Sequence, residues 1–127
     1  MRITLSLLVF LVTGFAPAHA QGTSPLALVG KWSISTRHPS GAMIVATVVF
    51  QQSLRFKATV TADGKPFAES DGTWTLEDKT LTWRYETSTQ PRLAKMVDTD
   101  ELVAVDATKL VLQSRLSGKR QEWLRVP

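Results

Sequence analysis

The sequence predicts an all-β protein, a small antiparallel up-and-down barrel of about eight strands. Apolar and polar residues alternate with a period of two in several short segments, and turn residues recur about every ten residues. No segment has the length and periodicity of an ordinary helix. Trp32 stands near the start of this series and Arg125 near its end, where the first and last strands of a closed barrel become neighbours.

The first two predicted strands are residues 30 to 37 and 42 to 51. The second is apolar on both faces and rich in β-branched residues, so one face fills the barrel and the other needs a cover. The outer set is either Met43, Val45 and Val49 or Ile44, Val48 and Phe50. Self-association through the outer set would cover it.

The next two strands, residues 53 to 62 and 66 to 77, are joined by Asp63 and Gly64. This pair tolerates the positive φ angles of a tight hairpin. Phe67 and Trp74 have opposite parity, so a bulge near Gly72 is needed if both side chains point inward. The alternative is a turn at Gly72 that divides this strand in two.

Four further strands complete the series, and their ranges are 80 to 87, 98 to 105, 109 to 116 and 120 to 126. Alternation in the first of them places Leu81, Trp83 and Tyr85 inside. Strands in simple succession favour an up-and-down barrel, which removes exposed sheet edges. A sandwich of six to seven strands with a different pairing is the alternative.

Residues 1–20 predict export. Arg2 precedes an apolar run, and Ala18-His19-Ala20 is a small-x-small cleavage site, as in secretory signal peptides. The run is shorter than the roughly 20 residues of a membrane-spanning helix. We therefore expect a signal peptide at 1–20, a single domain at 21–127, a periplasmic or secreted location and no integral membrane span.

The composition argues against most chemistries. The chain has no cysteine, which excludes acylation as a lipoprotein, disulfides and thiol catalysis. His38 is the one histidine beyond the predicted signal peptide, and it precedes a proline in a turn. Residues 98 to 101 are mostly acidic but lack the glycine turn and ligand spacing of a calcium loop. We expect no enzyme, no cofactor and no metal site, and export makes a nucleic-acid partner unexpected.

The residues at the two ends of the series resemble those of a known superfamily. Gly30-Lys31-Trp32 on the first strand and Arg125 on the last resemble the signature of the calycins, which include lipocalins, fatty-acid-binding proteins and avidins. A second triplet, Gly72-Thr73-Trp74, is similar to those of small bacterial lipocalin-like proteins. The resemblance implies that Trp32 and Arg125 close one end of the barrel, with Gly30 allowing a close passage of the chain.

This polarity predicts which loops surround the open end. The loops that follow the first, third, fifth and seventh strands share the end opposite Trp32. Their charged residues are mostly basic, with Asp63 inside the loops and Asp98 at the edge as the acids. The ligand-binding residues that we predict at this rim are Arg37, Lys65, Arg92, Lys95 and Lys119, and those that we predict in the interior are Phe56, Trp83 and Tyr85. A basic rim around an apolar interior suits an amphiphile with an anionic head, such as a fatty acid.

Two functions from different classes follow from the sequence. The first is an exported protein that binds a small apolar or amphiphilic molecule, an anionic lipid-like one among them, inside the barrel. The second is a filled barrel that acts through its outer surface, as an envelope accessory or inhibitor that binds a protein partner. The loop at 88 to 97 is expected to fold over the barrel end, as a plug or a lid. The presence of a cavity separates the two functions.

Overall fold

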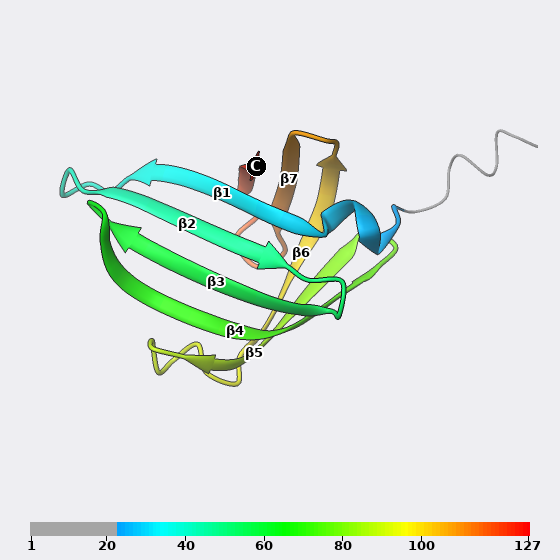
Figure 1. The fold of residues 1–127 in the computed structure, drawn as a ribbon, viewed down its shortest axis with the longest axis horizontal. Helices are drawn as coiled ribbons and strands as arrows, with labels where there is room; N and C mark the ends of the chain where they lie inside the picture. The colour runs from blue at the N-terminus through cyan, green and yellow to red at the C-terminus, as the bar shows by residue number, and fades with distance from the viewer. Residues whose placement is uncertain (1–22) are drawn as a thin grey trace, which may run out of the picture.

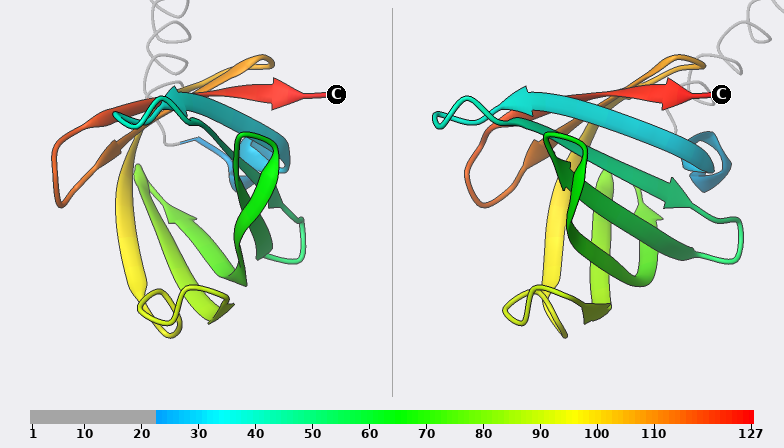
Figure 2. Two further views of the ribbon diagram at one scale, coloured as in Figure 1. Left: turned by 90° about the vertical axis from the view of Figure 1, so that its left-hand side faces the viewer. Right: turned by 60° about the vertical axis from the view of Figure 1, so that its left-hand side comes forward.

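Eight antiparallel strands form a closed barrel in which consecutive strands pair and the last strand pairs with the first (Figure 1 and Figure 2). The structure is a computed structural model and describes residues 23–127. The predicted signal peptide at 1–20 lies outside the described residues. The predicted fold class is confirmed, and the sandwich alternative is excluded.

One short 3-10 helix, η1 (Pro25–Leu28), precedes the strands, and Ser24 caps it by accepting a hydrogen bond from the Leu26 amide. The strands are β1 (Gly30–Arg37), β2 (Met43–Phe50), β3 (Arg55–Ala62), β4 (Lys65–Glu77), β5 (Thr80–Ser88), β6 (Val97–Val105), β7 (Lys109–Ser114) and β8 (Arg120–Val126). Each overlaps one of the predicted ranges. In residues 23–127 no helix is long and apolar enough to cross a membrane.

The two faces of β2 are now assigned. Val48 and Phe50 are buried inside the barrel, and alternation places Ile44 with them. Met43 and Val45 therefore belong to the outer face, where they are half-buried. The first of the two outer sets that the sequence allowed is the one the structure has.

The expected inward position of Phe67 is wrong. Its side chain is 60% exposed, whereas Ala68 beside it is buried. Phe67 is the extra residue of a bulge, because Val60 pairs with Ala68 and Thr61 already pairs with Pro66. Ala68 and Trp74 then lie on the same face of β4 by simple alternation. Both are buried without a bulge at Gly72 in β4.

A second irregularity does lie at Gly72, but its extra residue is on the partner strand. Asp71 pairs with Thr87 and Gly72 pairs with Tyr85, which leaves Glu86 of β5 unmatched. A Cβ atom at Gly72 would collide with the main-chain carbonyl of Arg84. Glycine is required here because the two backbones approach closely.

The end of the barrel beside η1 is closed by Trp32 and Arg125. The guanidinium carbon of Arg125 lies 4.1 Å from the centroid of the Trp32 ring, so the predicted contact is present. Arg125 also donates hydrogen bonds to the main-chain oxygens of Ala27, Val29 and Ala107. We call this the closed end; η1 lies against it, and the fully buried Leu28 side chain belongs to its core.

Gly30 belongs to the same closure. Its φ angle is +135°, a conformation that side-chain-bearing residues rarely adopt. A Cβ atom at this position would also overlap the Arg125 guanidinium. The Gly-Lys-Trp triplet and the late arginine therefore form one interlocked unit.

Candidate functional site

A cavity of about 560 Å³ occupies the half of the barrel that is farther from Trp32, and we call it the lumen. Its volume lies within the range of about 300–1,000 Å³ that is typical of small-molecule sites. It is lined from β1, β2, β3, β5, β6, β7, β8 and the β7–β8 loop. The left view of Figure 2 faces the barrel end at which the β1–β2 and β7–β8 loops lie.

The lumen has two chemically different walls. The strands β1 to β3 supply a mainly apolar wall, which contains Ile34, Ile44, Ala46, Val48, Ala58 and Val60. The strands β5 to β8 supply an aromatic and polar wall, which contains Trp83, Tyr85, Asp98, Asp100, Ser114, Gln121 and Trp123. Such a cavity suits a ligand that has one apolar side and one polar side.

A cluster of packed aromatic side chains adjoins the lumen. Phe50 packs on Trp74 and on Trp83, with ring centroids 5.1 Å apart in both pairs. Phe56 contacts Trp83 at 5.2 Å and Tyr85 at 5.3 Å, nearly edge-to-face in both pairs. The predicted site residues Trp83 and Tyr85 therefore line the lumen, whereas Phe56 is fully buried beneath them and holds them in place.

Two carboxylates project into this lumen from β6. Asp98 and Asp100 are two residues apart on one strand, so both face the same side. Asp100 is only 8% exposed, and its Oδ2 accepts a 2.8 Å hydrogen bond from Trp83 Nε1. Burial raises the pKa of Asp100 above its ordinary value, the Trp83 bond opposes this, and the charge of Asp98 adds to it.

The same environment acts on Tyr85. Burial, followed by the charges of Asp98 and Asp100, raises its pKa to about 12. The Tyr85 hydroxyl is therefore protonated at neutral pH and is available as a donor or an acceptor. The polar wall thus contains a protonated phenol beside two carboxyl groups.

Neither carboxylate has an ion-pair partner within residues 23–127. The ion pairs of this part of the chain are Arg55 with Glu86, Arg55 with Asp71, and Lys109 with Glu122, all between half-exposed or exposed side chains. Lys119 and Arg120 line the lumen as well, but both are exposed residues in and beside the β7–β8 loop. The positive charge lies at the rim of the lumen and the negative charge lies on its wall.

Trp123 is a further unusual group of this wall. The residue is 8% exposed, and its Nε1 is the one buried side-chain nitrogen or oxygen in residues 23–127 that has no hydrogen-bond partner. By contrast, Nε1 of Trp32 bonds to the Leu28 carbonyl, and that of Trp74 to the carbonyls of Gln51 and Arg55. A buried donor without an acceptor destabilises the protein, so its presence needs an explanation.

The predicted basic rim is only partly brought together. Lys119 lines the lumen, but Arg37, Lys65, Arg92 and Lys95 do not. Arg37 donates a hydrogen bond to the Gly41 carbonyl within its own turn. The β5–β6 loop, residues 89–96, contributes no lining residue, so it is not a plug inside this cavity.

Sequence reasoning did not place Asp98, Asp100 and Trp123 in the site. Residues 98 to 101 were considered as metal ligands, although their parity with Leu102 already puts Asp98 and Asp100 on the inner face. Alternation along β6 was the available signal. Whether Asp98, Asp100 and Trp123 have partners depends on the three-dimensional arrangement, which the sequence does not indicate.

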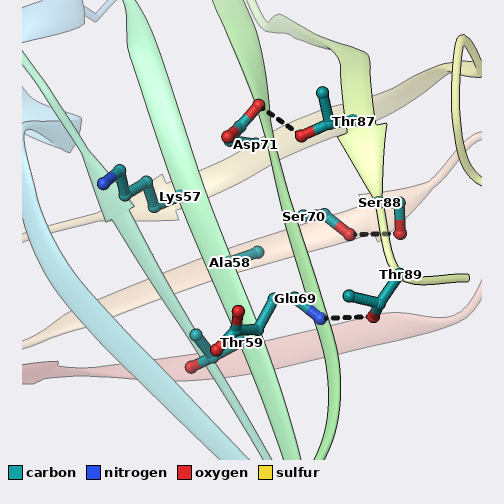
Figure 3. A pocket seen from close by; sticks show the side chains of 9 residues that line it. All are labelled: Lys57, Ala58, Thr59, Glu69, Ser70, Asp71, Thr87, Ser88 and Thr89. Atoms are coloured by element: carbon teal, nitrogen blue, oxygen red, sulfur yellow. Dashed lines mark hydrogen bonds between the residues drawn. The ribbon is translucent and has the colours of Figure 1, made fainter.

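A second hollow of about 460 Å³ lies over β3, β4 and β5 (Figure 3). Several of its polar groups bond to one another: Thr87 bonds to Asp71, the Ser70 and Ser88 hydroxyls bond to each other, and the Glu69 amide bonds to Thr89. Since these groups already have partners, this hollow offers a ligand fewer free contacts than the lumen does.

The described residues contain no cluster of three or more histidine or acidic side chains that is suited to hold a metal ion. The fold and the site together define a small β-barrel with an internal cavity. Comparison of the chain with protein-family models and with curated proteins found no match.

Proposed function

We propose that the protein binds a small amphiphilic molecule inside its lumen. The observation that carries the proposal is the lumen itself, a cavity of about 560 Å³ with an apolar wall from β1 to β3 and a polar wall from β5 to β8. Burial of an apolar ligand surface against the first wall supplies affinity, and polar groups on the second wall set its orientation. The proposal is for binding without a chemical step.

We include in this proposal that the chain is an exported calycin-like barrel. The up-and-down topology and the stacking of Arg125 on Trp32 support the likeness to calycins. The apolar run and small-x-small site within residues 1–20 support export to the periplasm or the exterior. The alternative of a filled barrel acting only through its outer surface has less support, because the interior contains a cavity of about 560 Å³.

Binding of an uncharged fluorophore tests this proposal. Prodan is apolar, compact and neutral, and its emission increases and shifts to the blue in an apolar site. We expect a saturable increase with the purified protein. Ala58→Trp, which places a bulky ring in the lumen, should abolish it, whereas Lys57→Trp on the exposed face of the same strand should not.

The adjacent pair of variants also separates the two hollows. Lys57 lines only the second hollow, over β3 to β5, and Ala58 lines both. Loss of prodan binding in Lys57→Trp would move the site to the outer hollow. Absence of saturable binding in the unmodified protein would remove the proposed function.

A further inference from the structure

We propose that the ligand is a compact amphiphilic amine whose ammonium group lies against Asp98 and Asp100 and whose hydrocarbon part lies against the wall from β1 to β3. This inference rests on the proposed function, because both concern the same lumen. It specifies the sign of the ligand's charge, which the basic residues in the sequence had predicted to be negative.

The two carboxylates of the lumen lack a counter-charge among the described residues. Removing a carboxylate from water is unfavourable unless an opposite charge or several donors accompany it. Asp100 is buried and accepts one hydrogen bond from Trp83, and Asp98 Oδ1 accepts one from the Thr99 amide. No cation among residues 23–127 pairs with either group, so a cationic ligand would supply the missing counter-charge.

Aromatic residues share the cavity wall with these carboxylates. Trp83 and Tyr85 line the lumen, and tryptophan and tyrosine rings attract ammonium groups. The Trp83 N–H also fixes the Asp100 carboxylate before any ligand arrives. A carboxylate that is already held in place loses little entropy when it binds a cation.

Trp123 supports the inference independently of charge. Trp123 lines the same cavity, and its buried Nε1–H lacks an acceptor within the described residues. A ligand oxygen that reached this nitrogen would satisfy the donor. The lumen therefore contains two acceptor groups without a cation and one donor without an acceptor, which together match an amine that also carries a hydroxyl, ether or carbonyl oxygen.

The arrangement of charges disfavours an anionic amphiphile. The cations that line the lumen, Lys119 and Arg120, are exposed residues of its rim. A carboxylate head at the rim would direct its tail toward Asp98 and Asp100, which would remain unpaired and lose more water. A carboxylate head placed deeper would be repelled by both.

Titration calorimetry with three octyl compounds tests the inference. Octylammonium, octanol and octanoate share one chain and differ in the charge of the head, and direct calorimetry does not depend on prodan. We expect octylammonium to bind about tenfold more tightly than octanol, because its hydrogen bonds to carboxylates are charge-assisted. Octanoate should bind more weakly than octanol.

Two variants assign the preference to the carboxylates. In the double variant D98N/D100N, octylammonium should lose most of its preference over octanol, with octanol unchanged within about twofold, because asparagine keeps the shape and removes the charge while the aromatic rings remain. E101Q is the matched control, since Glu101 is an acid of the same strand that does not line the lumen. It should keep the full preference for the ammonium compound.

The outcomes distinguish this inference from the function on which it rests. Prodan binding with equal affinity for the three octyl compounds, or tighter binding of octanoate, would leave the proposed function standing and overturn the inference. Retention of the ammonium preference in D98N/D100N would also overturn it. Failure of prodan and of all three octyl compounds to bind would remove both.

Discussion

The two halves of the barrel differ in whether their polar groups have partners. At the closed end, Nε1 of Trp32 and of Trp74 are bonded, and Arg125 donates to three carbonyls. In the lumen, Asp98 and Asp100 have no ion pair and Trp123 Nε1 has no acceptor among the described residues. Unsatisfied polar groups cost stability, and proteins retain them mainly at functional sites.

Two acidic residues show the same difference. Asp106, in the turn between β6 and β7 at the closed end, accepts hydrogen bonds from the amides of Thr108 and Lys109, and these bonds lower its pKa. Asp100, on the lumen wall, has a raised pKa because it is buried. Ionisation favours the fold at Asp106 and opposes it at Asp100. The closed end thus contains an acid that its neighbours stabilise in the ionised form, and the lumen contains one whose ionisation its surroundings oppose.

Removal of a large side chain from the closed end should have the largest effect. We expect Trp32→Ala to lower the free energy of unfolding by about 3–5 kcal/mol, because a fully buried ring is lost and Arg125 loses its support. Ile44→Ala, in the half-buried wall of the lumen, should cost only about 1 kcal/mol. Urea unfolding measures both, and equal costs would contradict the division of the barrel into two halves.

Substitution of one glycine at each end of the barrel should give the next largest difference in stability. Gly30→Ala should cost about 3 kcal/mol, because φ is +135° and the new Cβ overlaps the Arg125 guanidinium. Gly118→Ala, in the β7–β8 turn at the open end, should cost about 1 kcal/mol, since its φ is +75° and no atom lies within 4 Å of the added Cβ. Thermal unfolding of the pair should rank them in this order.

Asp106 and Asp100 should contribute opposite slopes to the dependence of the free energy of unfolding on pH. Asp106 contributes stability above the pKa of the unfolded chain, and this contribution is lost as the pH falls through its lowered pKa. Asp100 does the reverse: because its pKa is raised, stability falls as the pH rises from the unfolded value through the folded one. D106N should therefore flatten the rise of stability with pH, and D100N should steepen it.

Urea titrations at a series of values from about pH 3 to pH 7 measure these slopes. Asparagine keeps an oxygen for the Trp83 N–H at position 100 and for the turn amides at position 106, so both substitutions remove mainly the charge. D100N should be at least as stable as the unmodified protein at neutral pH. A D100N protein that is less stable there would show that the ionised carboxylate already has a stabilising partner.

The closed end could be predicted from the sequence because residue types and strand order indicate it. Gly30, Trp32 and Arg125 have residue types that only a few geometries explain, and the Asp63-Gly64 hairpin has positive φ at both residues, as its type requires. Strand alternation also located Trp83 and Tyr85 on the inner face. The hairpin and inner-face predictions depend on backbone conformation and parity, whereas the Trp32–Arg125 contact follows from barrel closure and from the resemblance to calycins.

The lumen could be predicted only in part, because its character depends on which groups lack partners. Charged loop residues suggested a basic site, yet Arg92 and Lys95 lie outside the lumen, while Asp98 and Asp100 lie within it. Phe67 was misplaced because a bulge shifted parity before Ala68. Loop position and bulges depend on tertiary packing, which a single-residue pattern does not encode.

The smallest effect should come from loss of the Trp123 N–H, because this donor has no acceptor in the free protein. In the free protein, Trp123→Phe removes a buried N–H without an acceptor, so it should cost about 1–2 kcal/mol less stability than Trp74→Phe, which loses the same ring volume and a bonded N–H as well. An octyl amine that carries a hydroxyl should bind the variant about two- to threefold more weakly, whereas octylammonium, which has no oxygen, should bind both equally. Trp74→Phe is the matched control, because its Nε1 is already bonded to two carbonyls and should cost stability when removed. A Trp123→Phe protein that is destabilised as much as Trp74→Phe would show that the Trp123 N–H already contributes a hydrogen bond in the free protein.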